Sequence, residues 1–354
     1  MKNKILLISV AVMLVIGLVM AGCAKPAPVP APAPALAPAP APAEPRVLKA
    51  IASEPVDFVA WNTMYFHMEE VERLSHGQLI IDLVGGIEVT PQQEQIYAVG
   101  EGIFDINYNA GADLAHAVPL AHLMPTTNMT SWEEYESGLW DLYCDVFAEQ
   151  TNTYYLGNAI APMFLRMGTK VPVRNLEEAQ GLKVRAVSGE LPFWDAVGMK
   201  GVLIGDMDLY TAFERGVVDT LCYPCMGWSQ WGWADLVDYI VGPRIGFAGN
   251  GCYIINLDTW NSLSAEEQEW LTQPFIDKAE LWWGYNYWLY RGEVWGEDSL
   301  KKLGIEFIDW PEEDSQKLQE AYVEIVYKEN IKNVSPDIAK RFADIVGRPL
   351  PEGM

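Results

Sequence analysis

The chain has 354 residues, of which 50% are hydrophobic, and a formal net charge of −24 at pH 7. Its length and apolar fraction are enough for a large hydrophobic core and favour two lobes over one. Such an acidic surface repels nucleic acid and anionic lipid headgroups, and the sequence shows no basic patch to offset it, so we expect no nucleic-acid partner.

The N-terminus has the pattern of a secretory leader. Lys2 and Lys4 precede the apolar run 5–20, and small residues stand directly before Cys23. This pattern is typical of a signal peptide, residues 1–22, whose removal leaves Cys23 to carry a lipid. The alternative is an uncleaved membrane anchor, for which roughly 16 apolar residues are a little short. We therefore expect an extracytoplasmic protein that is anchored to a membrane by its lipid.

Residues 23–45 combine the lipidated Cys23 with a Pro/Ala linker. An alternation of Pro and Ala cannot bury a core, so it predicts an extended spacer of about 3.1 Å per residue, roughly 65–70 Å in all. Such a spacer sets the globular part away from the membrane.

The following segment is predicted to alternate strands with helices. Strands are expected at 46–52, 78–84 and 104–108, and helices at 57–74, 91–99 and 132–150. Alternation of this kind is typical of an α/β protein with a parallel sheet.

The stretch from Gly181 to Asp219 predicts a strand–helix–strand–helix unit. The strands are expected at 182–187 and 202–204, and the helices at 190–197 and from Asp206 or Asp208 to Gly216.

Arg185 stands at the end of the first strand of this unit. Parallel sheets bind ligands beyond the carboxyl ends of their strands, where a guanidinium can hold a carboxylate through two parallel hydrogen bonds. Arg185 is therefore our first candidate for a ligand anchor, and a surface ion pair is the alternative.

The same part of the chain resembles a known family. The segments 175–185 (Asn-Leu-Glu-Glu-Ala-Gln-Gly-Leu-Lys-Val-Arg), 208–213 and 215–219 are similar, in order and spacing, to the solute-binding proteins of tripartite ATP-independent periplasmic (TRAP) transporters of the DctP type. Upstream, 72–80 and 100–105 match two more recurring segments. The resemblance runs, with gaps, from about Arg46 to about Tyr327.

This resemblance implies an α/β, two-lobed periplasmic-binding-protein-like fold with a long helix spanning both lobes. We expect that helix over the aromatic segment 265–303, and chain crossings near 160–163 and 248–251. Lobe I is then 46–162 plus 250–288, and lobe II is 163–249 plus 289–354. The lobes of the family close around the ligand by hinge bending.

The resemblance also implies a site in the second lobe. Arg185 matches the family arginine that binds the substrate carboxylate, and Arg166 matches a second arginine after a shift of register. Tyr223 stands where the family often has an asparagine that reaches the ligand. Asp206 is either a helix N-cap or, if it faces the cleft, a partner for a cationic group on the ligand, as in an amino or quaternary-ammonium acid.

Further candidates lie around this expected site. Asn107 and Asn109 follow the third strand and are expected to supply amide contacts from the other lobe. Trp228, in the tryptophan-rich segment 226–233, suggests a ligand with an apolar or cationic part, with core packing as the alternative. Trp61 and Glu54 are weaker candidates.

The sequence gives little support to catalysis. It has no Gly-x-Ser-x-Gly elbow, no His-Glu-x-x-His, no P-loop and no dinucleotide fingerprint, so we expect no catalytic residue, cofactor or metal ion. Cys222 and Cys225 have the spacing of a redox or zinc motif but lack its context, so a structural bridge or two free buried thiols is expected.

The sequence therefore predicts an extracytoplasmic solute-binding lipoprotein that captures a small organic acid in an interlobe cleft. The resemblance implies delivery to the membrane subunits of a TRAP transporter. The alternatives are a secreted carbohydrate-active hydrolase and a binding protein of another uptake or sensory system.

Overall fold

The structure is a computed structural model that describes most of the chain from Glu44 to Met354. The residues outside the described part are 1–43, 59–61, 128, 159–163, 227, 247–250, 279, 280, 282, 283 and 285–295. The predicted leader, the lipidated Cys23, nearly all of the linker and the candidate Trp61 therefore lie outside the described residues.

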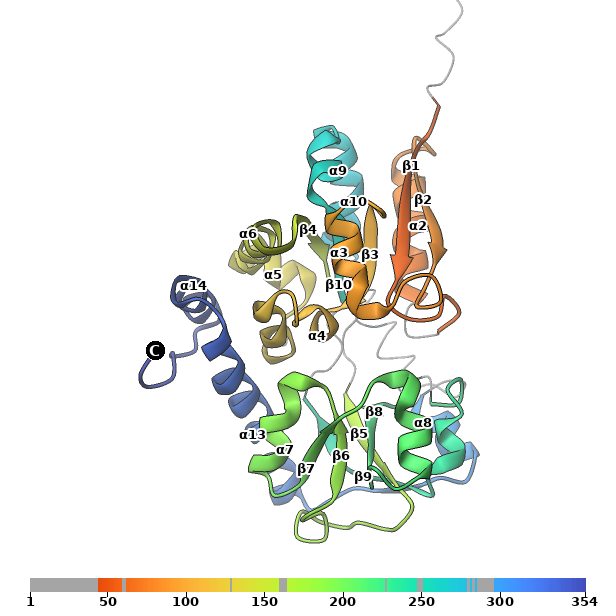
Figure 1. Cartoon of the computed structure of the whole chain (residues 1–354), viewed down its shortest axis with the longest axis vertical. Helices are drawn as coiled ribbons and strands as arrows, with labels where there is room; N and C mark the ends of the chain where they lie inside the picture. The colour runs from red at the N-terminus through yellow and green to blue at the C-terminus, as the bar shows by residue number, and fades with distance from the viewer. Residues whose placement is uncertain are drawn as a thin grey trace, which may run out of the picture. The chain divides into compact units, whose positions relative to one another are not determined.

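The first sheet has five strands in the order β2–β1–β3–β10–β4 (Figure 1). Their bounds are β1 Arg46–Ala52, β2 Leu79–Gly85, β3 Ile106–Ala110, β4 Thr153–Gly157 and β10 Gly251–Asn256. β2, β1 and β3 are parallel, whereas β10 is antiparallel to both of its neighbours. The three predicted strands of this region are confirmed to within two residues.

The helices of the first lobe follow the predicted order with one difference. They include α2 Asn62–Leu74, α3 Gln95–Gly100, α4 Gly111–Leu114, α5 Ser131–Ser137 and α6 Leu139–Thr151. The single helix predicted over 132–150 is wrong, because Gly138 adopts a left-handed conformation, with φ of 81°, and ends α5 before α6 begins.

The second sheet has the strand order β11–β9–β5–β8. These strands are β5 Leu165–Thr169, β8 Leu221–Pro224, β9 Tyr239–Ile245 and β11 Glu306–Ile308. A parallel pair, β6 Lys183–Ala186 and β7 Lys200–Leu203, continues the sheet through a bridge between Val184 and Thr220. With α7 Leu191–Ala196 and α8 Asp206–Glu214, the predicted strand–helix–strand–helix unit is confirmed.

The chain passes twice between the two sheets. β4 belongs to the first sheet and the next strand, β5, to the second, while β9 belongs to the second sheet and β10 to the first. The two arriving strands, β5 and β10, are the ones that run antiparallel to their neighbours. The predicted crossings fall between these strands, and the exact lobe boundaries stay a prediction.

The helix expected over 265–303 is described only at its ends. The structure describes α10 Ala265–Asp277 and α12 Glu297–Lys302, and α10 ends at its C-cap Lys278, so this range is not one unbroken helix. Most of 279–295 lies outside the described residues, so a helix across both lobes in this range stays a prediction. Among the described helices, α13 Glu312–Asn330 packs against β9 and α7 of the second lobe and against the 3₁₀ segment Pro119–Thr126 of the first (Figure 1).

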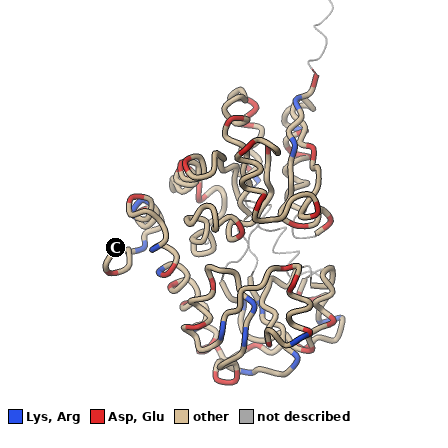
Figure 2. The backbone as a smooth tube through the Cα atoms, viewed as in Figure 1, with Lys and Arg blue, Asp and Glu red and all other residues tan. Residues whose placement is uncertain are grey.

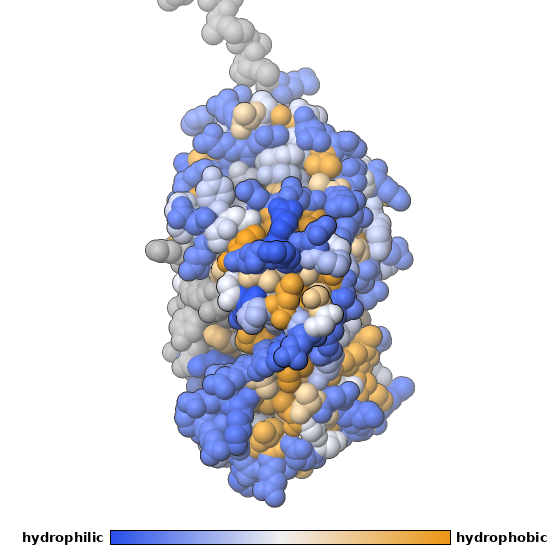
Figure 3. Space-filling model, turned by 90° about the vertical axis from the view of Figure 1, so that its left-hand side faces the viewer, coloured by the Kyte–Doolittle hydropathy of each residue, from blue (hydrophilic) through white to orange (hydrophobic). Residues whose placement is uncertain are grey.

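The C-terminal helix α14, Pro336–Val346, packs against α6. Its Phe342, together with Tyr327 and Ile331, belongs to the buried cluster of the first lobe. These contacts favour ending the second lobe near Val326, whereas we predicted that it continues to residue 354. The face on the left of Figure 1, where α13 and α14 lie, mixes apolar and hydrophilic residues (Figure 3).

The described part of the second sheet is buried on both faces. Met167, Val184 and Cys222 belong to one hydrophobic cluster, and Leu221, Trp228 and Phe213 belong to another. Acidic side chains outnumber basic ones along the backbone (Figure 2). Among the described helices, none combines the length and apolar character needed to cross a bilayer.

His67 joins three elements in the core of the first lobe. Its Nε2 lies 2.9 Å from the carbonyl oxygen of Leu271, which can only accept, so Nε2 carries the proton and Nδ1 accepts from the hydroxyl of Tyr108 at 2.8 Å. Burial lowers the pKa of His67 from 6.5 to about 4, because the charged imidazolium loses its hydration.

His67 is therefore expected to lower the stability of the protein as the pH falls from 6.5 to 4, whereas the raised pKa of buried carboxyl groups such as Asp113 and Glu134 acts in the opposite direction. In this window the unfolded chain binds a proton at His67 that the folded protein does not, which lowers the free energy of unfolding by up to about 3 kcal/mol. Urea unfolding between pH 4 and pH 7 measures the slope. His67→Phe should be about 1–3 kcal/mol less stable at pH 7, because Tyr108 and Leu271 lose their partner. An unchanged slope in this variant would contradict the assignment.

Candidate ligand-binding site

Arg185 lies near the end of β6, where the next β–α turn holds its guanidinium. Its Nε donates to the carbonyl oxygen of Ile204 at 3.0 Å, and its Nη2 forms an ion pair with Asp206, the first residue of α8. Only 5% of Arg185 is exposed. The ion pair is therefore the main compensation for a buried charge.

Tyr223 completes a triad with Arg185 and Asp206. The Cζ of Arg185 lies 5.3 Å from the centre of the Tyr223 ring, within the range of a cation–π contact. The Tyr223 hydroxyl lies 3.5 Å from Oδ2 of Asp206. Three of the predicted site residues, taken from β6, α8 and β8, are thus brought together.

Residues of the first lobe meet this triad. Glu54 follows β1 and forms a hydrogen bond with Asp206. Gln92 donates through its Nε2 to Oδ2 of Asp113 at 3.0 Å and to Oε1 of Glu54 at 3.4 Å. Because Glu54 and Asp113 each follow a strand of the first sheet, the carboxyl ends of strands from both sheets meet here.

Four carboxyl groups act on the charge of the Arg185 guanidinium, those of Asp206, Glu54, Asp113 and Glu190. Burial raises the pKa of Glu54 well above its usual value, and the charges of Asp206 and Asp113 raise it further. Burial and the charge of Asp206 raise the pKa of Asp113 to about 7. Glu54 therefore binds a proton more readily than an exposed carboxyl group does.

Aromatic side chains continue the site away from Tyr223. Trp233 contacts Tyr223 edge to face at 5.0 Å and stacks on Trp231 at 5.4 Å. Trp231 in turn contacts Phe58 of the first lobe at 5.7 Å. This row of rings joins the two lobes beside the carboxyl groups.

Trp228 lies in the same buried cluster as Trp233 but makes none of the ring contacts of this row that are described above. It is fully buried, and a Cβ built on Gly168 would approach its ring to 2.8 Å. A glycine on β5 leaves the space that this indole fills. The contacts favour the packing interpretation of Trp228 over the ligand-binding one.

Asn107 and Asn109 are fully buried in the first sheet. Nδ2 of Asn107 donates to Ile51 O and to Oε1 of Gln95, and its Oδ1 accepts from Asn109. Because the hydrogen bonds of Asn107 are made within the protein, the structure favours a structural role for it over the predicted ligand contact.

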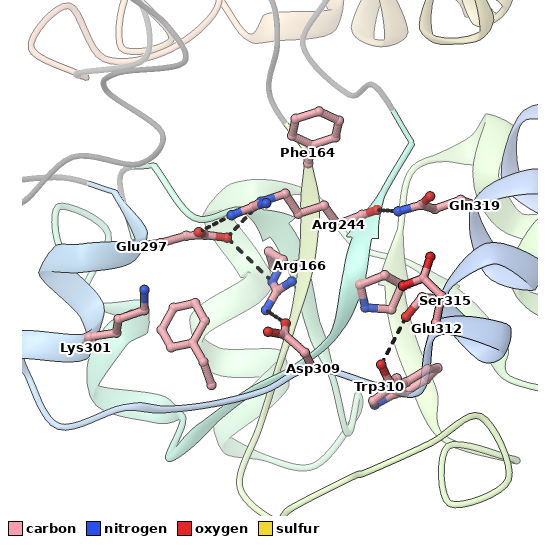
Figure 4. A pocket seen from close by; sticks show the side chains of 12 residues that line it. Phe164, Arg166, Arg244, Glu297, Lys301, Asp309, Trp310, Glu312, Ser315 and Gln319 are labelled. Atoms are coloured by element: carbon pink, nitrogen blue, oxygen red, sulfur yellow. Dashed lines mark hydrogen bonds and ion pairs between the residues drawn. The ribbon is translucent and has the colours of Figure 1, made fainter.

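The side chain of Arg166 pairs with residues other than those that contact Arg185. It lies directly opposite Tyr223 in the β5–β8 ladder, but its Nη2 pairs with Asp309 at 3.2 Å and its Nε lies 3.9 Å from Glu297 (Figure 4). Glu297 also pairs with Arg244. The guanidinium of Arg166 is therefore paired with Asp309 and Glu297 and not with Asp206 of the Arg185 triad.

Arg166 instead lines a pocket of about 680 Å³ in the second lobe (Figure 4). The lining residues are Phe164, Arg166, Pro243, Arg244, Glu297, Lys301, Phe307, Asp309, Trp310, Glu312, Ser315 and Gln319. Three basic and three acidic side chains balance each other in this lining, so the pocket has no excess of either charge.

Sequence reasoning missed Asp113 and Gln92 and gave Glu54 little weight. Asp113 stands three residues after the end of β3, in α4, so its place just beyond a strand was the available signal. What the sequence did not reveal is that Gln92, from a separate turn, joins Asp113 to Glu54.

The cysteine pair and the possible metal ligands are the remaining features that the sequence brought up. Cys222 and Cys225 are free and buried, and burial raises the pKa of both thiols, so they are poor nucleophiles. Within the described ranges, no group of three or more His, Cys, Asp or Glu side chains has an arrangement that would hold a metal ion.

The profile of the family "Bacterial extracellular solute-binding protein, family 7" (DctP) matches residues 58–333. The chain belongs to this family. The resemblance noted from 175–219 is thereby confirmed. The family consists of solute-binding proteins and not of enzymes.

Solved structures of TRAP periplasmic solute-binding proteins share the fold. One from Desulfovibrio salexigens, with bound orotic acid, is 13% identical, with a TM-score of 0.72 and coverage of 85% of this chain and 98% of that one. DctP7 of Bordetella pertussis, which binds pyroglutamic acid, is 18% identical, with a TM-score of 0.70 and coverage of 86% and 100%. The expected α/β, two-lobed fold is thus confirmed.

The ion pairs in the pocket around Arg166 predict how two substitutions change the free energy of unfolding. Glu297 is 2% exposed and pairs with two arginines, whereas the side chain of Asp309 is 82% exposed. Glu297→Gln should lower the free energy of unfolding by about 3–5 kcal/mol, because Arg166 keeps a buried charge without its buried partner. Asp309→Asn, which removes the same charge at an exposed position, should change it by less than about 1 kcal/mol. Urea unfolding at pH 7 compares the two, and equal losses would contradict the burial argument.

Proposed function

We propose that this DctP-family protein binds a small organic acid between its two lobes, with Arg185 as the carboxylate anchor. The observation that carries the proposal is a buried guanidinium near the end of β6, where side chains of the other lobe meet it. Nη1 of Arg185 has no hydrogen-bond partner within the described part of the chain, so it is available to a ligand carboxylate.

The bound ligands of structural relatives support this class. The two relatives described above hold orotic acid and pyroglutamic acid, and DctPAm of Advenella mimigardefordensis is a sugar-acid-binding protein in complex with galactonate. All three ligands are small acids. Because these proteins are less than 20% identical to this chain, they support the class of ligand and not one compound.

Each site residue has a proposed part. Arg185 holds the carboxylate, Asp206 and Tyr223 flank it, and Trp231 and Trp233 form an apolar wall. Contacts between the lobes, such as the hydrogen bond of 2.8 Å from Gln230 to Asp57 O, are ones that lobe opening would break. We propose that opening admits the ligand and closing encloses it.

The protein is further proposed to be a lipoprotein that works with TRAP membrane subunits. The leader pattern and Cys23 support a lipid anchor, and the Pro/Ala linker supports a receptor that reaches away from the membrane. We also keep the predicted lobes as a proposal, with residues beyond about Val326 assigned to the first lobe because of their packing.

Replacing Cys23 tests the anchor. In the Cys23→Ser variant we expect the protein to move from the membrane fraction to the soluble extracytoplasmic fraction, because the thiol that receives the lipid is gone. Fractionation and intact-mass measurement of the mature protein follow the change. Cys144→Ser is the matched control and should stay with the membrane. If both variants fractionate alike, the lipid anchor is refuted.

Ligand binding is tested by thermal shift with monocarboxylates, dicarboxylates, sugar acids, amino acids and betaines. A ligand at a hundred times its dissociation constant should stabilise the protein by about 2.7 kcal/mol. Arg185→Lys should weaken binding at least tenfold, because a single ammonium cannot keep the contacts of Nε with Ile204 O and of Nη2 with Asp206 while a third nitrogen holds the ligand. The control variant Arg174→Lys changes an exposed arginine and should keep the affinity for the ligand unchanged. Stabilisation by neutral sugars alone, or turnover of a glycoside, would overturn the proposal.

A further inference from the structure

We propose that the ligand carries a cationic group together with its carboxylate, and that Asp206 is the residue that selects it. The proposal deepens the function proposed above and rests on it. It starts from the charges that meet around Arg185, where the protein already supplies an internal carboxylate to the anchor that the ligand needs.

The charge balance around Arg185 is unfavourable for a simple acid. Four carboxyl groups, of Asp206, Glu54, Asp113 and Glu190, act on one guanidinium, and Glu54 and Arg185 are 3% and 5% exposed. A plain carboxylate would bring a further acidic group into this buried space. Because uncompensated charge is costly where water is excluded, such a ligand would have to enter with additional protons.

A zwitterion resolves this conflict. Its carboxylate takes up Nη1 of Arg185, and its cationic group lies beside the carboxylates of Asp206 and Glu54. A positive charge beside these carboxyl groups opposes the rise in pKa of Glu54 and Asp113, so both hold their protons less tightly in the complex. The unlike charges of the ligand thus match the unlike charges of the site.

Asp206 is the selecting residue because it contacts Arg185, Tyr223 and Glu54 together. It pairs with Arg185, lies near the Tyr223 hydroxyl and shares a hydrogen bond with Glu54 of the other lobe. A plain acid competes with Asp206 for the guanidinium and leaves Asp206 without a counter-charge. A zwitterion supplies that counter-charge itself.

The aromatic row beside the carboxyl groups suits the same ligand. Tyr223, Trp233 and Trp231 form a continuous set of ring contacts that reaches Phe58 of the first lobe. Ring faces attract cations, and quaternary ammonium groups in particular are held by tyrosine and tryptophan. An amino acid or a betaine fits the combination of rings, carboxylates and one arginine.

Matched ligand pairs test the proposal on the unmodified protein. Glycine betaine is compared with 3,3-dimethylbutanoate, which replaces the charged nitrogen by carbon, and proline is compared with cyclopentanecarboxylate. Calorimetry at pH 7 should give at least tenfold tighter binding for the zwitterion of a pair that binds. If the anion without a cationic group binds equally or better, the selection is overturned while the proposed function stays intact.

Two variants test whether Asp206 is the residue that gives the preference for a zwitterion. In Asp206→Asn the preference should fall at least tenfold, because the zwitterion loses its counter-charge and the plain acid no longer competes for Arg185. Asp208→Asn removes an equal charge from the same turn of α8, at an exposed position, and should keep the preference. Equal behaviour of the two variants would contradict the role of Asp206.

A capture experiment covers ligands outside these pairs. The protein is equilibrated with a pool of organic acids, amino acids and betaines, and mass spectrometry identifies what it retains. A retained acid with an ammonium or other cationic group supports the proposal, and a retained acid without one overturns it. Retention that requires added Na⁺ or Ca²⁺ would also overturn it, because a metal ion would then supply the positive charge. If no acid is retained, the proposed function fails with it.

Discussion

A buried guanidinium that must keep a partner is the constraint on which this site depends. Arg185 lies near the end of β6, and Asp206, at the start of α8, supplies the partner. That ion pair joins β6 to the turn after β7, and the guanidinium also lies over the ring of Tyr223 on β8. Because Asp206 also bonds Glu54, one interaction connects the second lobe to the first.

The contacts between the lobes are of a kind that can open. Besides the carboxyl cluster they include His122 with Ser188 at 3.2 Å, Phe58 with Trp231, and Asn330 with Gly189 O at 3.0 Å. Polar contacts exchange with water at little net cost, whereas the cores of the two lobes stay closed when the lobes separate. This difference is what hinge bending requires.

Local patterns allowed much of the fold and part of the site to be predicted. The β6–α8 unit and the position of Arg185 follow from spacing along one segment, and the structure agrees with both. The helix over 132–150 failed at Gly138, because an apolar spacing does not show a left-handed residue. Asn107 and Arg166 could not be assigned from sequence, since their partners, Gln95 and Glu297, come from other elements. The same limit applies to Asp113, whose meaning comes from residues far away in the chain.

The two arginines, Arg166 and Arg185, differ in how completely the protein compensates their charges. Both lie near the ends of second-lobe strands, yet Arg166 has a buried carboxylate, Glu297, that is itself held by Arg244. Removing that carboxylate from Arg166 would leave several charges unpaired, so a ligand gains little there. Asp206, the partner of Arg185, also lies beside Glu54, a buried carboxyl group with a raised pKa, so the charges of this site are poorly balanced. A site whose charges are only partly compensated is the one that a ligand of matching charge can stabilise. Lobe closure and ligand selection then both follow from the incomplete charge compensation around Arg185.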